Sequence, residues 1–111
     1  MRDRMSKHIL EITKDSYEAT AKEHPKLVVD CWANWCGPCR QMTPIFEKVA
    51  EESSGKAAFG NMDCDKNPEL VRRFKVLAIP TLLFIKEGEV VESIVGLVPK
   101  EEIEAALRKV F

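Results

Sequence analysis

Charge of one sign, long apolar runs and flexible linkers are all scarce in this sequence. Its 17 basic and 18 acidic residues give a formal net charge of -1, and no block of like charge stands out, so we expect no nucleic acid partner. The longest apolar runs are a handful of residues, far short of the roughly 20 that span a bilayer, so we expect no membrane partner. Repeats, low-complexity tracts and Gly/Ser linkers are also missing. We therefore predict one domain over residues 1–111, with residues 1–6 as a loosely ordered extension.

Features of exported proteins are scarce as well. The start, MRDRMSKHILEITK, carries early positive charge but neither an apolar h-region nor a small-residue cleavage pattern, so we expect no secretory signal. A chain of this length can bury a core without disulfide staples. Its four cysteines therefore favour a reducing compartment, and we expect a cytoplasmic protein. In that setting a close cysteine pair is more often redox-active or metal-binding than structural.

Strand-like and helix-like patterns alternate along the chain. The run KLVVDCWA at 26–33 is almost continuously apolar, which is typical of a central strand covered on both faces. After Pro38 the period changes to that of an amphipathic helix. The other predicted strands lie at 8–13, 56–64, 81–85 and 90–95. Three further helices are predicted: one begins at Asp15, one begins with a capping Asn67 followed by Pro68, and one covers 99–111. The order βαβαβαββα predicts an α/β fold with a central mixed sheet and helices on both faces.

The motif W-C-G-P-C at 35–39 stands where the central strand ends and the helix begins. Three residues apart in a first helical turn, Cys36 and Cys39 point to one side, with Cα atoms near the range of about 4.4–6.8 Å that a disulfide requires. Free amides and the helix dipole favour a thiolate on Cys36, so we expect its pKa to be lowered and its sulfur to attack disulfides. Gly37 leaves room for a partner's backbone, and Pro38 stands where a missing N–H costs nothing. The shielded Cys39 suits a resolving role.

The four cysteines together also leave a metal site open. Cys31, Cys36 and Cys39 give C-x4-C-x2-C, which with the distant Cys64 is the spacing of a plant-type 2Fe–2S cluster. The context argues against a cluster, because cluster loops are irregular, whereas Cys31 lies in an apolar strand and a helix follows Cys39. A zinc site built from the same residues meets the same objection and lacks a second close pair. Cys31 and Cys64 are most simply buried thiols that pack as small hydrophobes.

Further motifs give the chain a resemblance to a known family. The W-C-G-P-C motif after an apolar strand, a helix that contains Pro44, the I-P-T run at 79–81 and a glycine at 96 resemble the thioredoxin family. The similarity covers nearly the whole chain, from about Ile9 to the end. The resemblance implies the thioredoxin fold and a thiol–disulfide oxidoreductase.

The same resemblance implies roles for individual residues. Cys36 is expected to attack the target disulfide and Cys39 to resolve the mixed disulfide, which leaves their own pair oxidised. Pro80 is expected to be cis and packed against the dithiol, although a trans bond is the better expectation from sequence alone. The residues implied for target binding are Trp35, Gly37, Pro38, Ile79, Pro80 and Gly96.

Asp30 interrupts the apolar central strand. Taken alone, a strand carboxylate is more often solvated, but the thioredoxin family has an aspartate six residues before its first active cysteine, and this favours burial. A buried carboxyl has a raised pKa, so Asp30 becomes a candidate proton acceptor for Cys39, acting through a water. The sequence departs from the family at Asn61, where many thioredoxins have a lysine near that aspartate. The proton relay is therefore expected to differ.

The resemblance also implies partners and excludes a bound cofactor. We expect a monomeric cytosolic reductant without cofactor or metal, which receives electrons from a thioredoxin reductase. Its expected partners are oxidised proteins, which in the family include ribonucleotide reductase, peroxiredoxin and methionine sulfoxide reductase. An oxidase or isomerase of the same fold is the alternative, and Gly37-Pro38 argues against it because neither residue stabilises the thiolate further. A binding subunit without turnover is a third hypothesis, which the intact cysteine pair disfavours.

Overall fold

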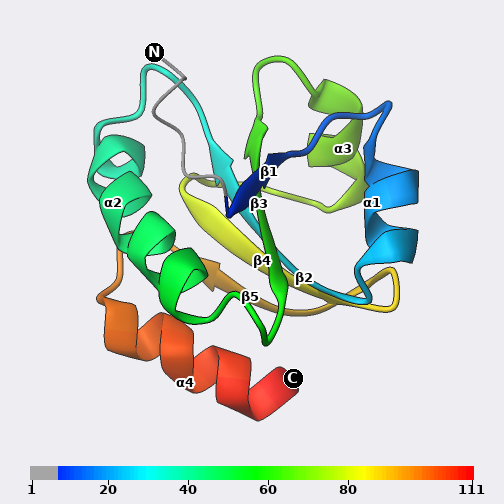
Figure 1. Cartoon of the computed structure of the whole chain (residues 1–111). Coiled ribbons are helices and arrows are strands. Elements are labelled where there is room, and N and C mark those ends of the chain that lie inside the picture. Colours follow the sequence, from blue (N-terminus) through cyan, green and yellow to red (C-terminus); the bar gives the residue numbers. More distant parts are fainter. Residues whose placement is uncertain (1–7) are drawn as a thin grey trace.

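Five strands and four helices alternate along residues 8–111, the part of the chain that the computed structural model describes. The expectation for residues 1–6 lies outside the described residues. The elements are β1 (Ile9–Glu11), α1 (Tyr17–Glu23), β2 (Lys26–Trp32), α2 (Gly37–Glu52), β3 (Ala58–Asp63), α3 (Pro68–Arg73), β4 (Thr81–Lys86), β5 (Glu89–Val95) and α4 (Lys100–Val110). Figure 1 follows this order from blue to red. The predicted order of elements is confirmed.

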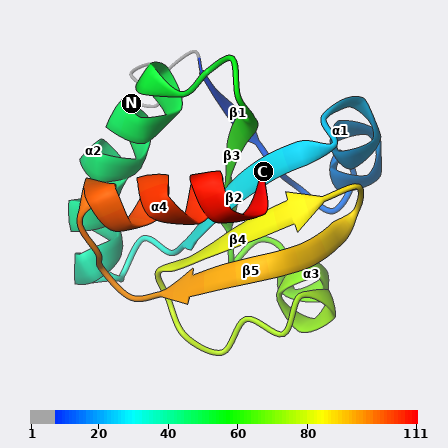
Figure 2. The ribbon, with the colours of Figure 1, turned by 90° about the horizontal axis from the view of Figure 1, so that it is seen from below.

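The strands form a mixed sheet in the order β1-β3-β2-β4-β5. β2 pairs in parallel with β3 and antiparallel with β4. β4 and β5 form an antiparallel hairpin, and Figure 2 shows these two strands side by side. β2 is thus the central strand, with a neighbour on either edge and a helical layer on either face. The nearly continuous apolar run of β2 fits this position, because residues 27–31 are all buried and Asp30 is the one polar residue among them.

Helices cover both faces of the sheet, as predicted. Figure 1 shows α2 and α4 on one side and α1 and α3 on the other. Successive residues of a strand point to opposite faces, so Val28 joins the core under α2 and α4 while Leu27 and Val29 join the core under α1 and α3. Phe46, Phe59 and Phe84 fill the first core. The two cores hold β2 rigidly from both sides.

One helix start and one helix cap differ from the sequence prediction. α1 begins at Tyr17 rather than Asp15, since residues 14–16 form a turn, and Ser16 Oγ accepts from the Thr13 backbone N–H at 3.0 Å instead of capping the helix. Asn67 does stand before Pro68 at the start of α3, but its side chain makes no cap. Instead, its Oδ1 accepts from the Lys14 N–H at 3.0 Å. Asn67 therefore ties the loop after β1 to the loop after β3.

Candidate active site

The dithiol stands at the junction of β2 and α2. Cys36 is the residue that precedes the first turn of α2, and its Sγ accepts a hydrogen bond from the Cys39 N–H at 3.2 Å. Cys36 and Cys39 are joined by a disulfide with a Cα–Cα distance of 5.2 Å, which lies inside the range expected from the sequence. The donor and the positive end of the helix dipole both stabilise negative charge on the Cys36 sulfur once the disulfide is opened.

Access to the disulfide is narrow. Cys36 is 4% exposed and Cys39 is 2% exposed, so both residues are buried just below the surface. The sequence predicts that Cys39 is the more shielded of the two, and in the oxidised state this difference in exposure is small. Gly37 offers an approach, because a Cβ built there would meet no atom within 4 Å. Pro38 beside it is exposed. A partner can therefore reach Cys36 over the bare backbone of Gly37.

A second segment packs against the dithiol. The Ile79–Pro80 peptide bond is cis, which confirms what the family resemblance implied. Ile79 is half-buried and packs on the cluster that contains Cys36 and Cys39. Pro80 is buried, and its carbonyl oxygen accepts from the Gly96 N–H at 2.8 Å. The structure thus brings the start of α2, the loop before β4 and the end of β5 to one place.

Gly96 has a backbone requirement of its own. Its φ is +100°, a conformation that residues with a side chain rarely adopt, and a Cβ there would meet no atom within 4 Å. The turn that follows β5 therefore requires a glycine at this position. The same position also leaves the surface beside Pro80 free of a side chain.

Trp35 projects from the surface beside the dithiol. Its side chain is 70% exposed, yet its Nε1–H donates to Asp65 Oδ2 at 3.0 Å. Asp65 is held in turn by its own N–H, which donates to Asp63 Oδ1 at 3.0 Å. Sequence reasoning missed Asp65, because 30 residues separate it from its partner. An exposed indole that is fixed in orientation presents an apolar surface at low entropic cost.

Asp30 is buried, and the solvated interpretation of this residue is wrong. It is 3% exposed, its Oδ1 makes no hydrogen bond, and burial raises the pKa of its carboxyl from 3.8 to about 7. It lines a cavity of about 160 Å³ together with Trp32, Thr43, Glu47 and Asn61, among others. A carboxyl with this pKa can take up and release a proton near neutral pH.

Thr43 links the cavity to the backbone of the second cysteine. Thr43 lines it and also donates from Oγ1 to the Cys39 carbonyl oxygen at 3.1 Å, one turn along α2. A water occupies about 30 Å³ in the liquid, so the cavity has room for several. Sequence reasoning did not single out Thr43, although its spacing of four from Cys39 would have placed it on the same helix face.

Asn61 is where the sequence departs from the family pattern. It pairs with Asp30 in the parallel register of β2 and β3, and its Oδ1 accepts from the Trp32 Nε1–H at 3.3 Å. Asp30 therefore faces a neutral amide here. Accordingly, desolvation is the cause of its raised pKa.

The other two cysteines lie outside this site. Cys31 is buried, as expected, but Cys64 is only half-buried, so the sequence prediction for Cys64 is wrong. The reason is that β3 ends at Asp63 and Cys64 already belongs to the following turn. Within residues 8–111, no group of three or more His, Cys, Asp or Glu side chains is arranged to hold a metal ion.

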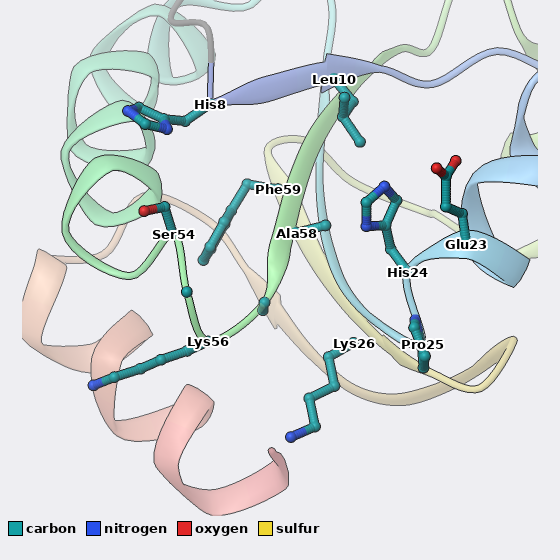
Figure 3. A pocket seen from close by; sticks show the side chains of 12 residues that line it. His8, Leu10, Glu23, His24, Pro25, Lys26, Ser54, Lys56, Ala58 and Phe59 are labelled. Atoms are coloured by element: carbon teal, nitrogen blue, oxygen red, sulfur yellow. The ribbon is translucent and has the colours of Figure 1, made fainter.

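The pocket in Figure 3 is also separate from the dithiol. His24, Pro25 and Lys26 contribute to it from the start of β2, and Ala58 and Phe59 from the start of β3. The dithiol follows the opposite end of β2.

No helix within residues 8–111 has the length and apolar character needed to cross a membrane.

The arrangement supports one type of chemistry. Two sulfurs that close into a disulfide beside an approachable backbone can exchange two electrons with another disulfide. The fold and this site define a thiol–disulfide oxidoreductase. The family model described as Thioredoxin matches residues 8–109. The chain belongs to the thioredoxin family.

Curated relatives agree along almost the full length. The chain is 44% identical to a protein named thioredoxin from Listeria monocytogenes, over 91% of this chain and 97% of that protein. It is 40% identical to a thioredoxin from Staphylococcus haemolyticus, over 91% of this chain and 96% of that protein. It is 37% identical to a thioredoxin from Alicyclobacillus acidocaldarius, over 92% of this chain and 97% of that protein.

Proposed function

We propose that this chain is a cytoplasmic reductant of protein disulfides that cycles between a dithiol and a disulfide. The Cys36 thiolate attacks one sulfur of a target disulfide and releases the other as a thiolate. Cys39, once deprotonated, attacks the Cys36 sulfur of this mixed disulfide and releases the reduced target. The observation that supports these roles is the Cys39 N–H aimed at Cys36 Sγ at 3.2 Å, at the start of α2.

The proposal gives Asp30 the proton of Cys39. Cys39 has to lose its proton before it can attack, and its own side chain is only 2% exposed, which keeps bulk water away from that step. The carboxylate takes the proton through water in the cavity that Thr43 borders next to Cys39. With a pKa of about 7, Asp30 is poised to hold the proton and then pass it on.

Target binding is proposed for the surface around the dithiol. Trp35, with 70% of its side chain exposed, forms one apolar part of this surface, and Ile79, which packs against Cys36 and Cys39, forms another. Gly37 and Pro38 at the start of α2, and Gly96 next to the buried Pro80, add no bulky side chains to this surface. This shape suits an extended segment of a target protein, whose cysteine is thereby brought over Cys36.

The proposal includes the setting in which the chain works. It acts as a monomer and as one domain, without a bound cofactor or metal. Members of the thioredoxin family typically receive electrons from a thioredoxin reductase and pass them to oxidised proteins, and we assign this chain the same two kinds of partner.

A redox titration tests this function. The intrinsic fluorescence of the purified protein is followed in buffers of defined thiol–disulfide ratio. Thioredoxins are known for a potential of about -270 mV, and a two-electron couple near that value, lost in Cys36→Ser, is the expected result. A potential near -120 to -180 mV would assign the chain to the oxidases and isomerases instead. In addition, Cys39→Ser should accumulate the mixed disulfide with a target, whereas Cys36→Ser should not.

A further inference from the structure

Two thiols that the proposed function does not use meet on neighbouring strands. Cys31 lies in β2 opposite Met62 of β3, and Cys64 follows two residues later, directly after β3. The Cys64 N–H donates to the Trp32 carbonyl oxygen at 2.8 Å, which fixes the turn against the end of β2. Cys64 packs against the core cluster that contains Cys31, and each thiol is close enough to shift the pKa of the other. They are therefore close enough to react with one another after a small movement of the turn.

The two sulfurs have different surroundings. Cys31 is 0% exposed, in the core under α1 and α3, whereas Cys64 is half-buried at the edge of that core. The hydrogen bond from Cys31 lowers the pKa of Cys64, against the opposing effects of burial and of the carboxylates of Asp63, Asp65 and Asp30. The same hydrogen bond and burial raise the pKa of Cys31. When the pair ionises, Cys64, the more accessible sulfur, therefore loses its proton before Cys31, which stays protonated behind it.

We propose that Cys64 and Cys31 form a second redox pair, in which Cys64 is oxidised by a small neutral hydroperoxide and Cys31 closes a disulfide with it. The division of labour is that of an accessible attacking sulfur and a buried resolving sulfur. This inference does not depend on the function proposed for Cys36 and Cys39.

The chemistry balances in two steps. The Cys64 thiolate attacks the terminal peroxide oxygen, the O–O bond breaks, and Cys64 becomes a sulfenic acid while hydroxide or alkoxide leaves and takes up a proton. The Cys31 sulfur then attacks the Cys64 sulfur, the S–O bond breaks, and hydroxide leaves with the Cys31 proton as water. Overall, two thiols lose two electrons and two protons, and hydrogen peroxide is reduced to two waters.

The surroundings of Cys64 favour this oxidant over a disulfide reagent. Asp63 and Asp65 flank Cys64 in the chain and repel an anionic partner such as oxidised glutathione. Half-burial also limits the size of the molecule that can reach the sulfur. A neutral peroxide meets neither obstacle.

The decisive experiment uses the Cys36→Ser/Cys39→Ser double variant. Trypsin cuts after Lys26 and Arg40, so Cys31 shares a peptide with the active-site pair, and removing that pair makes any link to the peptide of Cys64 unambiguous. The reduced protein is treated with hydrogen peroxide, blocked with iodoacetamide, digested without reductant and analysed by mass spectrometry. We expect a Cys31–Cys64 linked peptide and a monomeric protein that has lost two hydrogens. Fragmentation between Cys31 and Cys36 tests the same link in the wild-type protein.

Single substitutions separate the two roles. In Cys31→Ser, Cys64 should stop at the sulfenic acid, which dimedone traps, whereas in Cys64→Ser the buried Cys31 should remain a thiol. The proposal is overturned if both thiols are recovered unmodified under peroxide that closes the Cys36–Cys39 disulfide of the wild type. It is equally overturned if wild-type Cys64 proceeds to sulfinic acid without a link, or if the link joins two chains. Since the wild-type digest needs no substitution, a variant that fails to fold does not prevent the test.

Discussion

Asn61 lies opposite Asp30 in the parallel pairing of β2 and β3, and both side chains line the same cavity. Residue 61 therefore supplies no positive charge that would stabilise the ionised carboxyl of Asp30. Its pKa is raised to about 7 by burial, and its Oδ1 has no hydrogen-bond partner in the protein. Because of this pairing, a substitution at residue 61 should change the pKa of Asp30.

Asn61→Lys should lower the pKa of Asp30. An opposite charge within about 4–6 Å lowers a carboxyl pKa by roughly 1–3, so a value of about 4–6 is expected in place of about 7. Carboxyl-detected NMR titration of the oxidised protein measures it directly. The low-pH limb of the rate of target reduction should move in the same direction.

Asn61→Gln is the matched control for this charge. It lengthens the side chain but stays neutral, so the Asp30 pKa should remain close to its wild-type value. Equal titration curves for the lysine and glutamine variants would mean that position 61 does not act on Asp30, and the cavity would lose its place in the proton relay.

Asp30→Asn should stabilise the protein at pH 8 but not at pH 4. The carboxyl pKa is raised on folding from 3.8 to about 7, so between these values the folded state keeps a proton that the unfolded state releases. The free energy of unfolding of the wild type therefore falls as pH rises through this window, and above pH 7 the loss is complete. Three pKa units correspond to about 4 kcal/mol, which is the upper limit for the gain in the variant.

Urea unfolding at the two pH values measures this difference. Glu51→Gln is a suitable control, because it neutralises an exposed carboxyl on α2 and should leave the pH dependence unchanged. If Asp30→Asn changed the free energy of unfolding equally at pH 4 and pH 8, burial of the charged carboxylate could not be the cause of that change.

The order of elements and the dithiol could be predicted because their signals are local. The change of period after Pro38 and the W-C-G-P-C motif lie within one stretch of sequence, and the structure places α2 there. The burial of Asp30 needed the family resemblance, since a lone acid in a strand gives no sign of its environment. The cis bond before Pro80 needed it as well, because trans is the default.

The remaining features depend on contacts between distant segments. Asp65 fixes Trp35 only because the turn after β3 folds against the end of β2. Asn67 is a good capping residue in sequence terms, but its side chain bonds with a loop 53 residues away. Cys64 was predicted to be buried because the strand pattern continued through it, whereas the chain turns at that point.

Trp35→Ala should impair the reduction of protein disulfides more than that of small ones. The indole is 70% exposed beside the dithiol and offers contact area to a protein but not to a small reagent. Loss of an aromatic contact of about 1–2 kcal/mol corresponds to roughly a tenfold lower kcat/KM. Steady-state assays on a protein disulfide and on a small aromatic disulfide give the two values.

Two further variants at this position separate orientation from contact area. Trp35→Phe keeps a ring without the N–H, and Asp65→Ala keeps the indole without its acceptor. Both should fall between the wild type and Trp35→Ala. A loss of the same size on both kinds of substrate in Trp35→Ala would show that Trp35 acts on the dithiol itself rather than on the target.

Gly60→Ala should destabilise the fold without altering the redox chemistry. Gly60 pairs with Leu10 across β1 and β3, and a Cβ there would lie 2.7 Å from Ile12 Cγ1 and 3.1 Å from the Leu10 carbonyl oxygen. Ile12 is 0% exposed and has little freedom to move aside. Such overpacking costs about 1–3 kcal/mol, which a lower midpoint of urea unfolding would report.

Gly55→Ala is the comparison that isolates the steric cause. A Cβ at Gly55 would meet no atom within 4 Å, so this variant should be neutral or slightly more stable, by at most about 1 kcal/mol. The redox potential should be unchanged in both variants, because Gly55 and Gly60 lie outside the segments around the dithiol, which are the start of α2, the loop before β4 and the end of β5. A wild-type midpoint for Gly60→Ala would mean that β1 can shift away from β3 at little cost, and the tight approach of Ile12 to Gly60 would then contribute nothing to stability.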